Sequence, residues 1–126
     1  MNSLVISIGS NSRDRQWQVE HAILWLKKQL SGTKVSSIYN SEADNYRDPD
    51  YLNAVMYGEC KHDLATITQK VKEYEAICGR TPASKLLGNI PMDLDIVIWN
   101  GETIRAAEFN QAYFQQGWNE IKDSIF

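Results

Sequence analysis

Two segments of the chain carry apolar residues at helical spacing, and this pattern limits the folds that are open to it. The segments span residues 12–32 and 63–79. Ser12 and Asp63 are residue types that cap helix N-termini, while Gly32 and Gly79 suit the positions just after a helix ends. The apolar positions are Val19, Ala22, Ile23, Leu26 and Leu30 in the first segment, and Leu64, Ile67, Val71, Tyr74 and Cys78 in the second. The sequence therefore predicts two helices, each with one face turned to a core.

Four further segments have the composition of β-strands and lie around the two predicted helices. They are rich in β-branched and aromatic residues, and turn-forming residues bound them. They span residues 4–8, 33–39, 51–57 and 93–99. Asn100 and Gly101 follow the last segment, and this pair is a strong hairpin signal. The order β-α-β-β-α-β predicts a ferredoxin-like α+β fold, with a mostly antiparallel sheet and helices on one face.

Length and composition are those of one globular domain. The chain has 126 residues, of which 43% are apolar and 23% are charged. A single domain over residues 1–126 is therefore expected, although residues 106–126 have no clear period and no fold is predicted for them. The formal charge of −3 gives no basic surplus for binding nucleic acid or an anionic membrane. The oligomeric state is left open.

The cysteine content and the apolar run near the N-terminus indicate the cellular compartment. Cys60 and Cys78 form no C-x-x-C motif, and a chain of this length needs no disulfide, so both are predicted to be reduced. The apolar run over residues 4–8 is too short for a signal peptide or a membrane span. A cytoplasmic location is therefore expected.

Two aspartates stand two positions apart on the last predicted strand. Because side chains alternate along a strand, Asp93 and Asp95 share one face, with their Cα atoms about 6.6 Å apart. At that spacing both carboxylates can reach one cation or two neighbouring ones, and Mg²⁺ held together with phosphate oxygens fits such a pair. The alternative is an ordinary solvated strand face, and spacing alone does not decide between the two.

Two other residue pairs are candidates for ligand binding. Tyr51 and Asn53 share a strand face, where the ring can stack on a planar heterocycle and the amide can bond to its edge. Glu75 and Arg80 lie at the end of the second predicted helix, within reach of a phosphate or a metal. Taken alone, each pair is better explained as ordinary solvent-exposed polar residues, with Arg80 placed favourably at the negative end of the helix dipole.

Taken together, these motifs resemble the 6-hydroxymethyl-7,8-dihydropterin pyrophosphokinases of folate biosynthesis. The segments that carry the resemblance are Ile8-Gly9-Ser10-Asn11, Ser37-Ile38-Tyr39, Asp50-Tyr51-Leu52-Asn53-Ala54-Val55, Glu75 through Arg80 and Asp93-Leu94-Asp95-Ile96. The resemblance implies the ferredoxin-like fold. It also implies transfer of pyrophosphate from ATP, as co-substrate, to the hydroxymethyl group of a pterin with the help of two Mg²⁺ ions.

The resemblance also assigns roles to individual residues. It implies that Asp93 and Asp95 ligate the metal ions and, with Arg80, form the catalytic set. Tyr51 and Trp118 correspond to the rings that stack on the two faces of the pterin, and Asn53 to the group that bonds its edge. The positions expected to contact the nucleotide are Lys72, Glu75 and Arg80.

Several positions depart from the family pattern. Glu42-Ala43-Asp44-Asn45 replaces a Pro-Pro-Leu-Gly stretch, Ile90 stands where a catalytic arginine is expected, and Lys72 replaces a glutamine. An active enzyme would need Lys72, Lys85 or Arg80 to supply the missing positive charge. Two alternatives stay open: a catalytically impaired pterin- or nucleotide-binding module of the same fold, and a domain that uses its sheet only as an interface.

Overall fold

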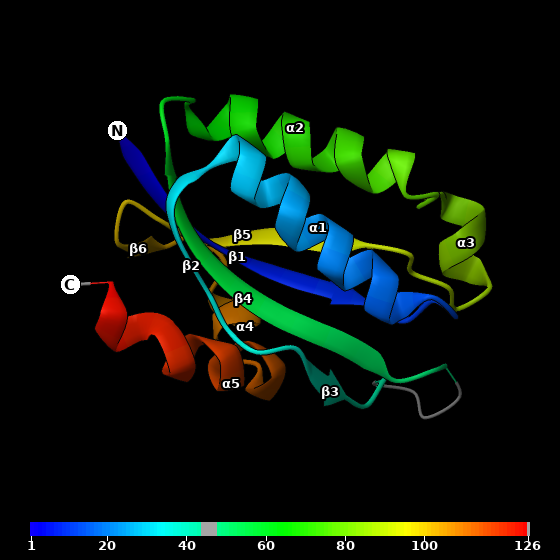
Figure 1. Cartoon of the computed structure of the whole chain (residues 1–126). Helices are drawn as coiled ribbons and strands as arrows, with labels where there is room; N and C mark the ends of the chain where they lie inside the picture. Colours follow the sequence, from blue (N-terminus) through cyan, green and yellow to red (C-terminus); the bar gives the residue numbers. More distant parts are fainter. Residues whose placement is uncertain (44–47, 126) are drawn as a thin grey trace.

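The computed structural model describes residues 1–43 and 48–125, and within them the chain forms a six-stranded antiparallel sheet (Figure 1). The strands are β1 (Asn2–Ser10), β2 (Ser31–Val35), β3 (Tyr39–Ser41), β4 (Tyr51–Cys60), β5 (Asp93–Trp99) and β6 (Glu102–Thr103). Their order is β2-β4-β1-β5-β6, and β3 also pairs with β4. Because β2 and β3 pair with successive parts of β4, they act as one interrupted strand. The order is then ferredoxin-like, and the predicted α+β fold is confirmed.

Helices cover both faces of the sheet. The two predicted helices are α1 (Arg15–Gln29) and α2 (Leu64–Ile77), which lie side by side on one face (Figure 1). The short α3 (Pro82–Leu86) follows α2. The tail forms α4 (Ala106–Phe109), α5 (Ala112–Ile121) and the 3-10 turn η1 (Lys122–Ser124), and α5 packs on the opposite face. The tail, for which no fold was predicted, therefore adds a second helical layer.

Each face of the sheet has its own apolar core. The larger core, between the sheet and α1 and α2, includes Leu4, Ile6, Ile8, Val19, Leu26, Ala54, Met56, Ile67, Val71, Leu94 and Ile96. The smaller one, between the sheet and α5, contains Val5, Val55, Val97, Ile98, Phe114 and Ile121. Alternate residues of β1 and β4 thus enter different cores, as side-chain alternation requires. On β5 the alternation is broken where the register with β1 shifts, so Val97 and Ile98 both enter the smaller core.

The bounds of α1 differ from those predicted. Ser12 does not cap the helix, because its hydroxyl donates to Asp14 Oδ1 at 2.7 Å and the helix begins at Arg15. The helix ends at Gln29 and not near Gly32. Gly32 lies inside β2, where the register with β4 shifts, and has a positive φ of 58°. Only glycine takes that conformation readily. For α2 the predicted cap is confirmed, since Asp63 accepts a hydrogen bond from the Thr66 backbone N–H at 2.8 Å.

Two other segments also differ from the sequence prediction. The predicted strand over residues 33–39 is split, because the Ser36 hydroxyl accepts the Val55 backbone N–H at 2.9 Å and so replaces a ladder carbonyl. Thr81 and Ser84 form a capping box that starts α3, in a stretch where no period was found. By contrast, β5 has the predicted bounds, and the hairpin predicted from Asn100 and Gly101 joins it to β6.

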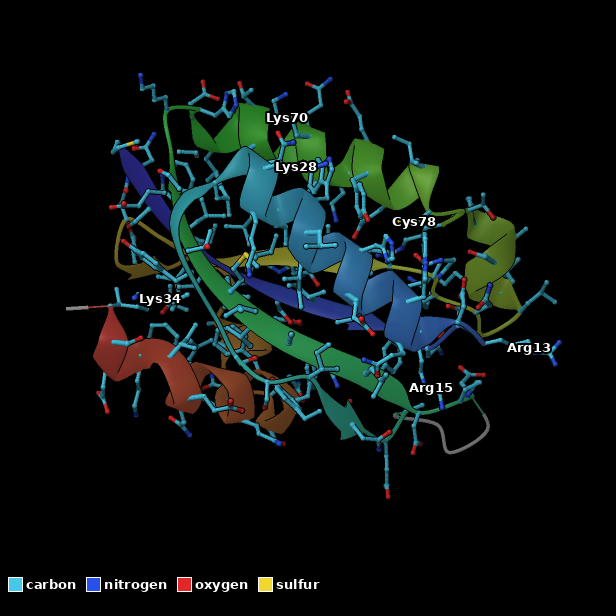
Figure 2. The ribbon with its side chains drawn as sticks, in the orientation of Figure 1. Arg13, Arg15, Lys28, Lys34, Lys70 and Cys78 are labelled. Atoms are coloured by element: carbon cyan, nitrogen blue, oxygen red, sulfur yellow. The ribbon has the colours of Figure 1, made fainter. Side chains whose placement is uncertain are left out.

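Of the basic residues labelled in Figure 2, Arg15 and Lys28 lie on α1, Lys34 on β2 and Lys70 on α2, while Arg13 precedes α1. Cys60 and Cys78 are both free thiols, as predicted. Across residues 1–43 and 48–125, no helix combines the length and apolar character that crossing a membrane would require.

Candidate functional site

A cavity of about 190 Å³ lies on the face of the sheet that carries α5. Its described lining is Ser7, Gly9, Ser41, Glu42, Ala43, Tyr51, Asn53, Asp93 and Tyr113. On β1, β4 and β5, the lining residues stand an even number of positions from Val5, Val55 and Val97, which lie in the smaller core. They therefore point to the side of the sheet where that core lies. Three residues predicted for the site, Tyr51, Asn53 and Asp93, therefore meet in one cavity.

Asn53 is held in one orientation by the neighbouring strand. Its Nδ2 donates to Ser41 Oγ at 2.7 Å and to the Tyr39 carbonyl at 3.5 Å. Its Oδ1 lies on the side of Gly9, where an added Cβ would come within 3.2 Å of it. The amide hydrogens are thus used by β3, and the carbonyl oxygen is the group with which Asn53 can accept a hydrogen bond from a ligand.

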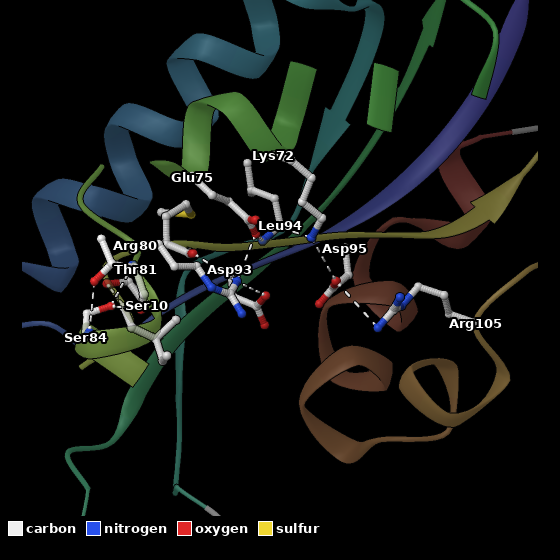
Figure 3. A network of polar contacts seen from close by, with 12 residues as sticks. Ser10, Lys72, Glu75, Arg80, Thr81, Ser84, Asp93, Leu94, Asp95 and Arg105 are labelled. Carbon is white, nitrogen blue, oxygen red and sulfur yellow. Dashed lines mark hydrogen bonds and ion pairs between the residues drawn. The ribbon is translucent and has the colours of Figure 1, made fainter. Parts of the chain in front are cut away.

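Asp93 and Asp95 lie on the same side of β5, as predicted, because Leu94 between them enters the larger core (Figure 3). Arg80 Nη1 binds Asp93 Oδ1 at 2.7 Å. Asp95 has a side chain only 11% exposed, with Arg105 Nη2 at 3.6 Å and Lys72 Nζ at 4.0 Å from its Oδ1. Burial, and then repulsion from Asp93, raise the pKa of Asp95 to about 7. The positive charge around this carboxylate therefore falls short of offsetting its desolvation.

The aspartate pair fits a Mg²⁺ ion that takes its other ligands from elsewhere. In the part of the chain that the structure describes, no cluster of three or more His, Cys, Asp or Glu side chains could hold a metal. Mg²⁺ commonly binds through one or two carboxylates together with waters and substrate phosphates, so two ligands suffice for this ion. A cation next to Asp95 would also supply the positive charge that its buried carboxylate lacks.

Glu75 forms the centre of a polar network on the other side of β5 (Figure 3). Its side chain is only 5% exposed, and its Oε2 lies 3.0 Å from Arg80 Nη1. The same oxygen accepts the Leu94 backbone N–H at 2.7 Å, and Lys72 Nζ lies 3.3 Å from Oε1. Because Arg80 also binds Asp93, Glu75 acts on the aspartate pair by positioning Arg80 and the β5 backbone.

A second depression, of about 380 Å³, collects the residues predicted for the nucleotide. Its lining is Lys72, Glu75, Ala76, Arg80, Thr81, Pro82 and Lys85. It lies at α2 and α3, while the first cavity lies on the α5 face, and the Arg80–Asp93 ion pair connects the two across β5. The predicted nucleotide residues are thus close to the aspartates but separate from Tyr51 and Asn53.

Two positions lie elsewhere than predicted. Trp118 does not line the cavity, because its ring packs on Phe114, with 6.3 Å between ring centroids, against the smaller core. Ile90 is only 8% exposed, and its backbone N–H donates to Asn11 Oδ1 at 2.6 Å. The side chain at the position of the expected arginine is therefore buried and supplies no charge there.

Two residues at the site were missed by the sequence analysis. Tyr113 lines the cavity from α5, and Arg105 pairs with Asp95 from the segment before α4. Tyr113 comes from the tail, whose sequence shows no period that would have placed it, and Arg105 lies just before the tail, between β6 and α4. Of the segment that departs from the family pattern, Glu42 and Ala43 line the cavity, while Asp44 and Asn45 lie outside the described residues.

Comparison with known proteins identifies related sequences. Residues 5–123 match the family model of 7,8-dihydro-6-hydroxymethylpterin-pyrophosphokinase. A 2-amino-4-hydroxy-6-hydroxymethyldihydropteridine pyrophosphokinase of Bacillus subtilis is 30% identical over 112 residues, covering 86% of this chain and 66% of that protein. The enzyme of the same name from Aquifex aeolicus is 29% identical over 106 residues, covering 83% and 66% respectively. A folate synthesis bifunctional protein of Arabidopsis thaliana is 31% identical over 106 residues, which are 80% of this chain and 21% of that protein.

The chain thus spans just under two thirds of the length of the two bacterial relatives. The matched range contains β4, α2, β5 and α5, so it includes the cavity, the aspartate pair and the depression at α2. With the fold, the site and the sequence match in agreement, the chain belongs to the 7,8-dihydro-6-hydroxymethylpterin-pyrophosphokinase family.

Proposed function

We propose that this protein transfers pyrophosphate from ATP to 6-hydroxymethyl-7,8-dihydropterin, with Mg²⁺, as a step of folate biosynthesis. The observation that carries the proposal is the cavity in which Tyr51, Asn53 and Asp93 meet. It joins an aromatic ring and a fixed amide, which suit a planar heterocycle, to one carboxylate of a metal-binding pair. Family membership supports the same reaction.

The pterin occupies the cavity in this proposal. The Tyr51 ring lies beside Gly9 in the lining of the cavity and stacks on the pterin in this proposal, and the Asn53 carbonyl accepts an N–H of the heterocycle edge. Asp93, in the same lining, brings the metal site next to the bound pterin. Mg²⁺ held by Asp93 and Asp95 neutralises charge on the ATP phosphates when it is bound.

The nucleotide phosphates lie toward α2 and α3 in this proposal. Lys72, Arg80 and Lys85 supply three positive charges there, and Glu75 holds Arg80 in place. The hydroxymethyl oxygen of the pterin forms a bond to the β-phosphorus of ATP, the bond from that phosphorus to the α–β bridging oxygen breaks, and AMP leaves. The hydroxyl proton passes to bulk water. Positioning and charge neutralisation are the main contributions a protein makes to such transfers.

A binding module with impaired turnover is the second candidate. Ile90, at the position of the expected arginine, is buried, and the described lining of the pterin cavity contains no lysine or arginine. One arginine aimed at a transferring phosphoryl group can be worth roughly 10³ to 10⁵ in rate. The same residues could therefore bind both ligands and turn them over slowly.

AMP production from ATP and 6-hydroxymethyl-7,8-dihydropterin, with and without Mg²⁺, tests the proposal. Asp93→Asn combined with Asp95→Asn should abolish Mg²⁺-dependent binding of a non-hydrolysable ATP analogue while circular dichroism shows an intact fold. The exposed Asp123→Asn serves as the matched control. Pterin binding without AMP formation would select the binding module, and the absence of both would refute both candidates. The cytoplasmic location and the single domain over residues 1–126 form part of the same proposal.

A further inference from the structure

Tyr39 is a buried tyrosine outside the cavity that connects β3 to α5. Its side chain is 8% exposed, and its hydroxyl makes two hydrogen bonds to α5. It donates to the Tyr113 carbonyl and accepts the Gly117 backbone N–H at 3.0 Å. Burial raises the pKa of Tyr39 to about 12, so the hydroxyl keeps its proton and can donate at neutral pH.

The two groups that Tyr39 joins are partners in an ordinary α-helix. An α-helical N–H bonds to the carbonyl four residues earlier, which for Gly117 is that of Tyr113. The Tyr39 hydroxyl thus sits between the donor and acceptor of one helical turn, an insertion of the kind that bends helices. The sheet thereby controls the course of α5 at the turn that carries Tyr113.

Gly117 makes this approach possible. A Cβ at this position would lie 2.6 Å from Tyr39 Oη and 2.6 Å from Val55 Cγ2, which is closer than real contacts allow. Glycine is needed at position 117 because the helix approaches β3 and β4 so closely. Its backbone conformation is not the reason, since Gly117 does not have a positive φ. A second tie lies one turn further on, where Glu120 accepts the Ser37 backbone N–H and hydroxyl, both at 2.9 Å.

Tyr113 is the residue whose position depends on this connection. It is the residue from α5 in the described lining of the cavity, and its carbonyl is the acceptor for Tyr39. Tyr51 lines the same cavity from β4, so the two rings come from the helical layer and from the sheet. Trp118, which the sequence assigned to the second ring, packs instead on Phe114.

We propose that Tyr39 is a positioning residue for the pterin site, because its hydroxyl fixes the turn of α5 that places Tyr113 in the lining of the cavity. This inference rests on the proposed function, since it takes a flat heterocycle as the ligand. Tyr39 touches no ligand itself. Its effect reaches the cavity through the backbone of α5.

The test compares Tyr39→Phe with Tyr57→Phe, using 6-hydroxymethylpterin and a non-hydrolysable ATP analogue as probes. Tyr57 is a matched control, because it also packs against the smaller core and its hydroxyl donates to Glu59 on the same strand at 3.3 Å. We expect Tyr39→Phe to weaken pterin binding roughly tenfold, as loss of one well-placed hydrogen bond would. The affinity for the ATP analogue with Mg²⁺ should be unchanged, and Tyr57→Phe should change neither.

A double-mutant cycle separates positioning from a general loss of structure. If Tyr39 acts through Tyr113, Tyr39→Phe should have no further effect on pterin binding in a Tyr113→Ala background. An equal loss in both backgrounds, or unchanged pterin binding by Tyr39→Phe alone, would overturn the inference while leaving the proposed function intact. A wild-type protein that does not bind the pterin would overturn the proposed function, and with it the inference.

Hydrogen exchange in the wild type provides a test that needs no variant to fold. Pterin binding should slow exchange of the Gly117 amide, because the ligand stabilises the turn that Tyr39 holds. The ATP analogue should leave this amide unchanged. Equal Gly117 exchange rates with and without a saturating pterin would contradict the inference even if Tyr39→Phe does not fold.

Discussion

Replacing Asp95 with asparagine should stabilise the metal-free protein, although the residue is proposed to serve its activity. The side chain is 11% exposed, and burial with repulsion from Asp93 raises its pKa from 3.8 to about 7. Between these values the folded state binds a proton that the unfolded state does not, so the free energy of unfolding falls as the pH rises. Above pH 7 the folded protein bears the full cost of the charge.

The size of the effect follows from the shift. About three pKa units at 1.36 kcal/mol each give roughly 4 kcal/mol as the upper limit, and we expect Asp95→Asn to gain about 2 to 4 kcal/mol at pH 8. Near pH 4 the gain should vanish, because the folded wild type is already protonated. Urea unfolding in EDTA at both values of pH measures this difference, with Asp123→Asn as the exposed control.

A clear result would refute the reasoning. If Asp95→Asn were equally or less stable than the wild type at pH 8, then Arg105 and Lys72 would already compensate the buried charge. A gain of the same size at pH 4 and pH 8 would also contradict it, since a packing effect does not depend on protonation.

Three further substitutions test other parts of the structure. Glu75→Gln should destabilise the fold by about 1 to 3 kcal/mol, measured by urea unfolding, because it removes the buried charge that binds Arg80. An unchanged midpoint of the urea transition would show that this charge is dispensable for folding. Ile90→Arg should lower the free energy of unfolding by about 3 kcal/mol or more, because it buries an unpaired charge. Faster AMP formation without loss of thermal stability would contradict this and show that the arginine side chain reaches the phosphates. Asp63→Ala should cost about 1 kcal/mol in thermal unfolding through loss of the cap of α2, and an unchanged melting temperature would count against that role.

The parts of the molecule that were predicted correctly depend on local rules. Alternation along β5 places Asp93 and Asp95 on one face wherever the strand packs, and capping by Asp63 needs only the next three residues. The Asn100-Gly101 hairpin is likewise set by the turn itself. These features could be read from the sequence because no distant residue has to be known.

The features that were missed depend on contacts between distant segments. Ile90 is drawn into the core because Asn11, 79 positions earlier, bonds to its backbone. Tyr113 and not Trp118 lines the cavity, and the helix that carries both is bonded to Tyr39, 74 residues before Tyr113. The polar and aromatic sequence of the tail does not indicate that the Tyr39 hydroxyl inserts into α5. Long-range docking thus decided which ring faces the cavity.

The open edge of β5 has a consequence for solubility. Among the residues that the structure describes, β6 pairs only with Ile98 and Trp99, so the half of β5 that carries the aspartates has β1 on one edge and no strand on the other. Such an edge is a template on which a strand of another molecule can add. Glu75 occupies the Leu94 N–H there with a buried carboxylate, and an incoming carbonyl would have to displace it. One buried acidic side chain thus occupies a backbone donor that an added strand would need, on the half of β5 that carries the aspartates.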